Sequence, residues 1–383
     1  MTVLIAPDSY KGALSASRAA AIMRDAIIAQ DAAARCILLP QADGGEGSVE
    51  ALLAAGCGVA RELRGRTLID EDRPLSVLDL GKGEWLIEAA SCIGWEMTRG
   101  RQGAANIVDS APLGELLLRI ATDARRVHVA LGGTASSDGG VGLAEALGAE
   151  LHFASHRPAE VFERLTAVRG VSWKRPFDAD VLVWADVRTP LLGPKGAVAT
   201  FGAQKGLAPT DVPRADAAMA HWASVLRRDV RAVPVDSAGG GAAGGLGYAL
   251  AALFDAPLLS GADEIRARTK VAQALHTADV LLTGEGRVDD QTAQGKVLRG
   301  MAQEAARAGV AVLVLAGRVE GDAVLLAREL GVDRIVEVSP KEWSVERCVR
   351  EAEQRLFDVV AALTRAGLPR RAAGGKGIGS GPS

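Results

Sequence analysis

Acidic side chains follow several apolar segments of this sequence, at the points where buried strands would end. The clearest case is LLTGEGRVDDQTAQGK, residues 281–296, which begins as an apolar strand and then places several charges beside two glycines. Asp8, Asp43, Asp138 and Asp186 follow other apolar runs. Carboxylates gathered at the carboxyl ends of parallel strands repel one another unless they bind Mg²⁺ or pair with cations. The pattern therefore predicts a ligand site.

Basic residues of the same loops could provide such pairing and neutralise a triphosphate. N-capping of the following helix is the alternative role for Asp43 and Asp138. Asp186 and Glu285 stand at no obvious cap, which favours a functional role for both. The basic residues are Lys11, Lys195, Lys205, Arg287 and Lys296.

Four glycine-rich loops lead from strand-like runs into helical patterns. DGGxG occurs at 43–47 and at 138–142, SAGGGAAGGLG covers 237–247, and the stretch 281–296 is the fourth. Glycine lets backbone N–H groups approach a ligand closely, and helix N-termini favour anions. The loops therefore predict a nucleotide-phosphate site, against the alternative that each glycine only makes a tight turn. The chain has neither a GxxxxGK[ST] P-loop nor a GxGxxG after its first strand, which argues against P-loop and dinucleotide-binding folds.

Apolar runs alternating with amphipathic helical patterns must position these loops. TVLIAP, CILLP and VAVLVLAG are continuously apolar, as expected for parallel strands covered on both faces. The alternation predicts an α/β fold: a parallel-sheet, Rossmann-like domain with a second, mixed α/β domain inserted into it. The expected boundaries are 1–62, 106–148 and 258–368 for the parallel-sheet domain, 63–105 and 149–257 for the inserted domain, and 369–383 for a disordered glycine-rich tail.

Length and composition exclude several classes of protein. A chain of 383 residues is long enough for two domains. The net charge of −3 and the aromatic content of 4% offer neither a basic field nor a stacking surface for nucleic acid. No apolar run approaches membrane-spanning length, and the apolar N-terminal run is too short for a secretory signal. Four scattered cysteines suggest neither a zinc ribbon nor disulfides, so we expect a cytoplasmic protein.

Several long segments resemble the bacterial glycerate kinase family, which phosphorylates D-glycerate with ATP. They occur in the family's order and span about residues 3 to 338. The resemblance implies two α/β domains with the active site in the cleft between them, ATP and Mg²⁺ as cofactors, and 2-phosphoglycerate as the usual product. The matching segments are IAPDSYKGALSA, LPQADGGEGSVEALL, LGGTASSDGGVGLAEALGA, ADVRTPLLGPKGA, FGAQKGL, GGGAAGGLGYAL, LLTGEGRVDDQTAQGKV and LAGRV.

The matching positions carry the expected site residues, whose individual roles are hypotheses. Glu46 and Asp138 also match the family pattern. Asp186 is the first choice to accept the proton of the substrate hydroxyl and Asp289 the second, while Arg287 could fork onto the substrate carboxylate. The expected residues are Asp186, Asp289 and Lys11 for catalysis; Asp8, Ser9, Arg287 and Thr292 for the substrate; Gly44, Gly45, Gly132, Gly133, Ser136 and Lys205 for the nucleotide; and Asp43, Asp186 and Glu285 for the metal.

The sequence departs from the family pattern in three places. Residues 106–117, NIVDSAPLGELL, replace a usual Thr/Tyr-Gly-Thr-Gly segment and keep only Gly114. Thr189 stands where Asn is usual, and Tyr10 where Phe is usual. These changes bear on substrate preference more than on phosphoryl transfer. Three alternatives therefore stay open: a product phosphorylated at the 3-position, a related small hydroxy acid as substrate, or a non-catalytic sensor of nucleotide or sugar acid. A homodimer is a further expectation.

Overall fold

The computed structural model describes residues 1–70, 72–289 and 296–369, and its chain divides into two compact units. The first unit comprises Met1–Ala42, Glu50–Cys57 and the chain from Ile265 onward; the second comprises Asp43–Val49 and Gly58–Glu264. The second unit is thus inserted into the first along the chain. Residues 370–383 of the expected tail lie outside the described residues.

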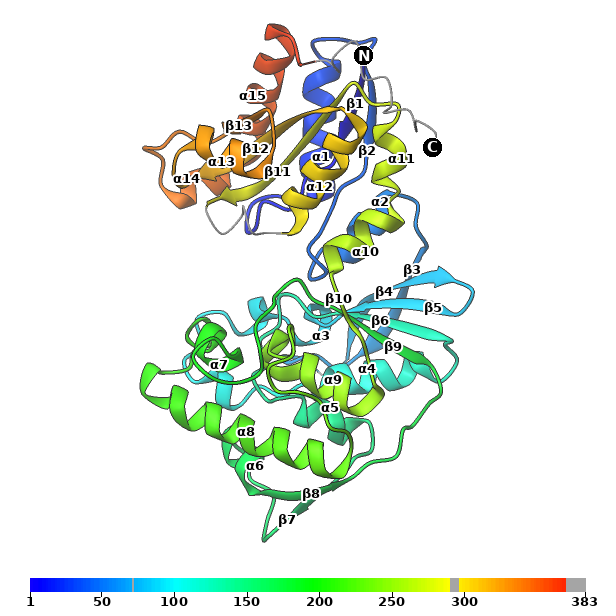
Figure 1. Ribbon diagram of the computed structural model, residues 1–383, viewed down its shortest axis with the longest axis vertical. Coiled ribbons are helices and arrows are strands. Elements are labelled where there is room, and N and C mark those ends of the chain that lie inside the picture. Colours follow the sequence, from blue (N-terminus) through cyan, green and yellow to red (C-terminus); the bar gives the residue numbers. More distant parts are fainter. Residues whose placement is uncertain (71, 290–295, 370–383) are drawn as a thin grey trace, which may run out of the picture. The chain divides into compact units, whose positions relative to one another are not determined.

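The first unit is built on a five-stranded parallel sheet in the order β13-β12-β11-β1-β2 (Figure 1). Numbered along the chain within this sheet, the order is 2-1-3-4-5, a doubly wound arrangement that reverses direction between β1 and β11. Ligands of such sheets bind at the carboxyl edge beside this reversal. The strands are β1 (Thr2–Ile5), β2 (Arg35–Leu38), β11 (Val280–Val288), β12 (Ala311–Val319) and β13 (Arg334–Glu337).

Helices cover both faces of this sheet. Alternate residues of each strand point to opposite sides, so a continuously apolar strand presents apolar side chains on both faces. Val3 and Ile5 of β1 pack with α1 and α15, whereas Leu4 packs with α11, α12 and α13 on the other face. The expected parallel, doubly covered sheet is confirmed. The helices are α1 (Ala16–Ile28), α11 (Val271–Leu275), α12 (Lys296–Ala308), α13 (Ala323–Leu330), α14 (Val345–Arg350) and α15 (Ala352–Ala366).

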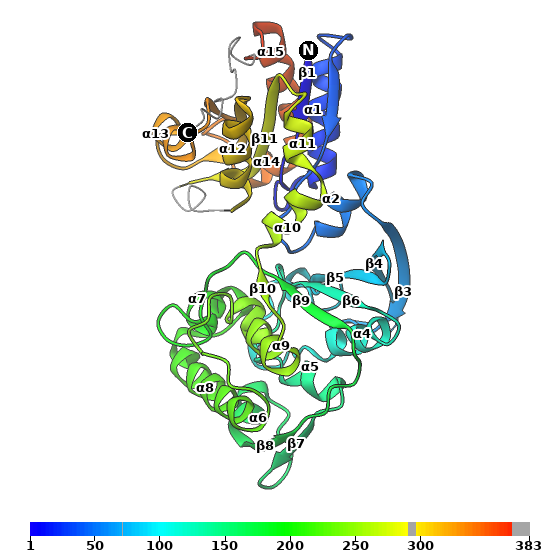
Figure 2. The same ribbon diagram turned by 45° about the vertical axis from the view of Figure 1, so that its right-hand side comes forward.

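The second unit contains a mixed six-stranded sheet, in the order β10-β9-β6-β5-β4-β3, and a two-stranded antiparallel sheet. Its strands β3, β4 and β5 are antiparallel, and β5, β6, β9 and β10 are parallel. Figure 2 shows the larger sheet from a second direction. The strands are β3 (Val59–Gly65), β4 (Arg73–Gly81), β5 (Glu84–Glu88), β6 (Arg126–Ala130), β9 (Asp180–Trp184) and β10 (Leu258–Leu259), with β7 (Glu150–Phe153) and β8 (Val168–Ser172) in the smaller sheet.

The helices of the second unit surround one large apolar core. Two more helices, α2 (Ser48–Ala54) and α10 (Gly261–Arg268), begin in the second unit and continue in the first. The helices of the second unit are α3 (Ala90–Ile93), α4 (Ala111–Ala121), α5 (Val141–Ala146), α6 (Val161–Ala167), α7 (Ala197–Phe201), α8 (Val212–Asp229) and α9 (Leu246–Phe254), with 3₁₀ turns η1 (Trp95–Thr98), η2 (Ala104–Asn106), η3 (Ala203–Lys205), η4 (Pro209–Asp211) and η5 (Ala242–Gly245).

The sequence-based domain boundaries need correction. Residues 106–148 were expected in the parallel-sheet domain, but they contribute β6, α4 and α5 to the second unit. Residues 43–49, 58–62 and 258–264, expected in the same domain, also belong to the second unit. The apolar run of β6 would suit either sheet; only its pairing with β5 and β9 places it. Strands β4 and β5 form a hairpin within the second unit. Its turn uses Lys82 and Gly83, both with positive φ.

The last helical region of the chain, residues 345–366, is interrupted at Glu351, which separates α14 from α15. Among the described residues, no helix combines the length and the hydropathy needed to cross a membrane.

Gly114 of the divergent segment packs α4 directly against α5. A Cβ at this position would lie 2.8 Å from the Cβ of Ala146 and 2.8 Å from the carbonyl oxygen of Leu143. Contacts this short require a shift of the backbone or of the neighbouring helix. The one glycine that residues 106–117 share with the family pattern therefore has a packing function.

Gly114→Ala and Gly114→Val test this packing. Helix propensity alone would make alanine more stable than glycine by about 1 kcal/mol. We expect the opposite: the free energy of unfolding falls by about 1–3 kcal/mol for alanine and by more for valine, because the added atoms overfill the contact. Urea denaturation followed by tryptophan fluorescence measures the change. A stabilised Gly114→Ala protein would contradict the close packing.

Candidate functional sites in the two units

The first unit brings most of its predicted site residues to the reversal point of its sheet. Asp8 continues β1 beside β11, and its backbone N–H donates to the carbonyl of Gly284 at 2.8 Å. The Asp8 side chain is buried, with Oδ1 accepting from the Ser9 N–H at 2.6 Å. Glu285 follows Gly284 on β11 and is half-buried. Lys11 is exposed. The structure thus places a carboxylate pair and a lysine at the edge where doubly wound sheets bind ligands.

Glycines allow the chain to crowd together at this edge. A Cβ on Gly284 would lie 2.1 Å from the carbonyl oxygen of Leu315, and one on Gly317 would lie 2.5 Å from the carbonyl oxygen of Gly286. A Cβ on Gly286 would also lie 3.2 Å from the backbone nitrogen of Lys11. The glycines of LLTGEG and LAG are therefore needed for backbone packing, whether or not a ligand is bound.

Tyr10 has a structural explanation for its difference from the family's usual phenylalanine. Its hydroxyl donates to the carbonyl of Leu315 at 2.8 Å in a buried position. Burial, reinforced by the negative charge of Glu285, raises the pKa of Tyr10 above its ordinary value. The phenol therefore stays protonated and ties the loop after β1 to the middle of β12.

Arg287 already has acidic neighbours within its own unit. Its guanidinium lies 2.6 Å from Glu320 and 3.1 Å from Asp289, and the arginine side chain is 59% exposed. A substrate carboxylate would have to compete with these two partners. Thr292, expected beside them, lies outside the described residues.

The second unit gathers its predicted residues at the carboxyl edge of β6, β9 and β10. Gly45 faces Gly132, the second residue after β6: a Cβ on Gly45 would lie 2.7 Å from the Cα of Gly132. Gly44 contacts Gly261 just as closely, with 2.6 Å between an added Cβ and the Gly261 Cα. Asp43 turns the loop by accepting from the Gly45 N–H through Oδ1 at 3.1 Å. Gly133, which follows Gly132, is exposed and has positive φ.

Asp186 follows β9 and interacts with the beginning of α10. Its Oδ1 accepts from the Ser260 hydroxyl at 2.9 Å, and its Oδ2 accepts from the Ala262 N–H at 3.3 Å. The sequence suggested no cap for Asp186, because the helix that it helps to cap begins 75 positions later. The carboxylate therefore has a structural role beside any chemical one.

Asp138 is a buried structural carboxylate. Its Oδ2 accepts from the Ser110 N–H, the Ser110 hydroxyl and the Gly142 N–H at 2.8–3.0 Å, and its Oδ1 accepts from the Gly140 N–H at 3.0 Å. Burial and the nearby Asp109 raise its pKa, whereas these hydrogen bonds favour the charged form. Ser110 belongs to the divergent 106–117 segment, which thus supports the second DGGxG loop. Sequence reasoning missed Ser110 and Ser260, because neither stands in a recognisable motif.

Lys205 is enclosed rather than presented to solvent. It is 5% exposed, and its Nζ donates to the carbonyl of Ser136 at 2.7 Å. Burial lowers the pKa of Lys205 to about 8, and the Asp138 carboxylate partly opposes this shift. Ser136 is fully buried, and its loop also contacts Gly244. A Cβ added to Gly244 would lie 2.2 Å from the carbonyl oxygen of Ser136. Lys205 thus links η3 to the loop that carries Gly132 and Gly133.

These two edges define a two-unit α/β enzyme whose carboxylates and glycine-rich loops suit a phosphorylated ligand. Comparison with known proteins gives the family. Residues 3–367 match the model of the glycerate kinase family. The chain is 32% identical to glycerate 2-kinase of Escherichia coli K12, over 92% of this chain and 94% of the relative. It is 31% identical to glycerate kinase of Bacillus subtilis 168, over 95% and 98%.

A solved structure agrees with these relatives. The crystal structure assigned as glycerate kinase 2 of Salmonella typhimurium LT2 superimposes with a TM-score of 0.79 at 31% identity, covering 96% of this chain and 98% of that one. The present chain belongs to the glycerate kinase family and is a kinase. The resemblance inferred from its motifs is confirmed.

A comparison of the wild-type protein with Lys205→Met across pH tests the burial of Lys205. Below pH 8 the amine is protonated in both the folded and the unfolded chain, so the full cost of burying the charge is present. Between about pH 8 and the ordinary value of 10.5 the folded chain binds fewer protons, so the free energy of unfolding rises with pH. We expect wild-type stability to gain about 2 kcal/mol relative to Lys205→Met between pH 8 and pH 10.

Urea denaturation of both proteins at each pH provides the measurement. Subtracting the free energy of unfolding of Lys205→Met from that of the wild type removes the contribution of the cysteines and tyrosines that the two proteins share. A stability difference that does not change with pH would mean that Lys205 is solvated in the folded protein.

Proposed function

We propose that this kinase transfers the γ-phosphoryl group of ATP to the C2 hydroxyl of D-glycerate, giving 2-phosphoglycerate. The observation that carries the proposal is the pair of carboxylate-bearing, glycine-lined sheet edges in a member of the glycerate kinase family. Phosphoryl transfer needs mainly positioned reactants and neutralised charge. The glycine-rich loops at these edges suit the positioning of the reactants, and the charged side chains there suit the neutralisation of charge.

The nucleotide phosphates are assigned to the edge of the second unit. Gly44, Gly45 and Gly132 bring backbone close to backbone, and Gly133 beside them adopts a positive φ; such glycine-rich backbone suits a polyanion. Ser136 and Lys205 are buried beneath this loop, so we now assign them to positioning it rather than to direct contact with phosphate. This is a revision of their expected role.

Asp43 and Asp186 are suited to hold Mg²⁺. Both offer carboxylate oxygens, the donors that Mg²⁺ prefers, and both approach Gly261: Asp43 through its carbonyl and Asp186 through the neighbouring Ala262 N–H. The described residues contain no ready-made group of three metal-ligating side chains. Mg²⁺ in kinases needs only one or two carboxylates, because water and phosphate oxygens complete its shell. When bound, the ion would offset charge developing on the phosphates. Glu285, the third ligand expected from the sequence, belongs to the first unit.

The acceptor is assigned to the edge of the first unit. Asp8 and Ser9 could orient hydroxyl groups of the substrate, and the guanidinium of Arg287 matches the planar geometry of a carboxylate. Thr292 remains a proposed substrate contact. Lys11, exposed after β1, is proposed to neutralise the transferring phosphoryl group.

One carboxylate must orient the acceptor hydroxyl or take its proton. Asp186 stays the first choice and Asp289 the second. The hydrogen bonds to Asp186 come from Ser260 and Ala262 and hold the carboxylate in a defined orientation. Asp289 instead forms an ion pair with Arg287, which couples it to the proposed substrate-carboxylate site.

Asp186→Asn separates the chemical role from the structural one. Asparagine keeps an oxygen that can accept from Ser260 or Ala262 but loses the negative charge. We therefore expect nearly unchanged thermal stability and a kcat lower by about 10²- to 10⁴-fold, as for loss of a general base or metal ligand. A coupled assay for ADP measures kcat.

Ser260→Ala is the matched control. It removes the hydroxyl that bonds Asp186 and leaves the carboxylate in place, so its kcat should fall far less. Equal losses in the two variants would mean that Asp186 acts through α10. Wild-type turnover in Asp186→Asn would remove this residue from the mechanism.

A direct product assay tests the reaction itself. Incubation with ATP, Mg²⁺ and D-glycerate should release ADP, and two-dimensional ³¹P–¹H NMR should show the phosphorus coupled to the proton on C2. Coupling to the C3 protons would establish the 3-phosphoglycerate alternative. Faster turnover of another small hydroxy acid in the same assay would reassign the substrate, and nucleotide binding without ADP release would indicate a sensor.

A homodimer and a cytoplasmic location stay predictions. Light scattering coupled to size-exclusion chromatography measures the first, and cell fractionation the second.

A further inference from the structure

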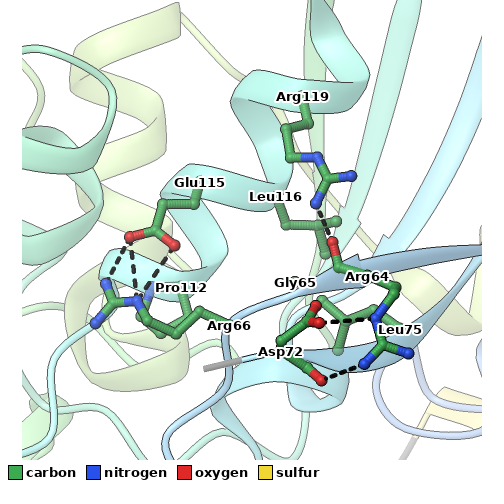
Figure 3. Close-up of a pocket in the computed structure, with 9 residues that line it drawn as sticks. All are labelled: Arg64, Gly65, Arg66, Asp72, Leu75, Pro112, Glu115, Leu116 and Arg119. Atoms are coloured by element: carbon green, nitrogen blue, oxygen red, sulfur yellow. Dashed lines mark hydrogen bonds and ion pairs between the residues drawn. The ribbon is translucent and has the colours of Figure 1, made fainter. Parts of the chain in front are cut away.

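A cavity in the second unit lies outside every residue assigned above. It has a volume of about 390 Å³ and lies between the end of β3, the beginning of β4 and one face of α4 (Figure 3). That volume is within the range of small-molecule sites. Its floor is apolar, since Leu75 and Leu116 are each 2% exposed. A concave site with an apolar floor and a few polar groups is the usual form of a ligand pocket.

The walls carry more positive than negative charge. Three arginines and two carboxylates line the cavity, a net charge of +1, although the whole chain carries −3. Guanidinium groups that face the same space repel one another, and an anion placed between them would relieve that repulsion. The charged residues are Arg64, Arg66, Asp72, Glu115 and Arg119.

Two of the arginines are held in place by their own carboxylates. Arg64 Nε lies 2.9 Å from an Asp72 carboxylate oxygen, and Arg64 Nη2 donates to the Asp72 carbonyl at 2.8 Å. Arg66 forks onto Glu115, with distances of 2.7–3.2 Å. Guanidinium has five N–H donors, so a carboxylate orients it without using them all. These contacts therefore fix the arginines before any ligand arrives.

Arg119 differs from the other two. Figure 3 shows it reaching from α4 to the main chain of Arg64, where its Nη1 donates to the carbonyl oxygen. Within residues 1–70, 72–289 and 296–369 it has no carboxylate at ion-pair distance. A cation anchored by a neutral carbonyl keeps its charge and further donors available to an anion.

We propose that this cavity binds a small phosphate monoester, with Arg119 as the main contact and Arg64 and Arg66 beside it. Guanidinium forks match phosphate oxygens, and a dianion gains more from three cations than a monocarboxylate does. The cavity is larger than a bare phosphate requires, so an organic portion could cover Leu75 and Leu116. The site is independent of the proposed reaction, and its loss would leave the kinase assignment unchanged.

Calorimetric titration of the full-length protein with glycerol 3-phosphate tests the proposal. Citrate at matched ionic strength is the second arm, and sodium chloride gives the baseline. We expect saturable binding of the phosphate ester that weakens by about ten- to a hundredfold in Arg119→Met, the loss expected for a charge-assisted contact. Arg119→Lys keeps the charge but not the two parallel N–H donors. Its affinity for the phosphate ester should lie between that of the wild type and that of Arg119→Met.

Arg227→Met is the matched control, because Arg227 is an exposed arginine of the same unit on α8. It should bind the phosphate ester like the wild type. Thermal unfolding checks each variant, and Arg119→Lys replaces Arg119→Met if the latter is unfolded. No binding up to about 10 mM, a concentration that would fill even a millimolar site, overturns the proposal. So does equal binding by wild type and the Arg119 variants, or binding of citrate alone.

Discussion

Backbone crowding at the carboxyl ends of the strands is the constraint on which both candidate edges depend. In the first unit, Gly284, Gly286 and Gly317 let β11 and β12 and the loop after β1 come together where an added Cβ would meet a carbonyl or amide at 2.1–3.2 Å. In the second unit, Gly45 meets Gly132 in the same way. A side chain at any of these positions would push the loops apart and separate the groups that they carry.

A second layer of buried polar groups holds these loops in place. Asp138 accepts four hydrogen bonds from Ser110, Gly140 and Gly142, and Lys205 binds the carbonyl of Ser136. Buried charges persist only when such partners satisfy them. The charged residues of these motifs thus divide into two kinds. Some, such as Asp138 and Lys205, are buried and stabilise the loops through hydrogen bonds. Others, such as Asp43 and Lys11, are less buried and lie at the sheet edges.

The departures from the family pattern mostly belong to that supporting layer. Ser110 of residues 106–117 supports the Asp138 loop, whereas Gly114, which the segment shares with the family pattern, allows the close contact of α4 with α5. Tyr10 adds a buried hydrogen bond to Leu315. These changes therefore alter how the site is supported more than what it presents. They give no structural reason to abandon glycerate as the substrate.

Local periodicity and motif spacing determined the fold class, the doubly covered parallel sheet and most of the residues at its carboxyl edge. A strand that is apolar at every position must be covered on both faces, so these features follow from the amino-acid sequence. Tertiary structure alone decided which sheet receives β6, because an apolar strand of five residues pairs equally well with many neighbours. It also decided that Asp186 bonds Ser260 and Ala262, and that Lys205 is buried. Such partners lie 69 to 76 positions apart, a separation at which no local pattern records a contact.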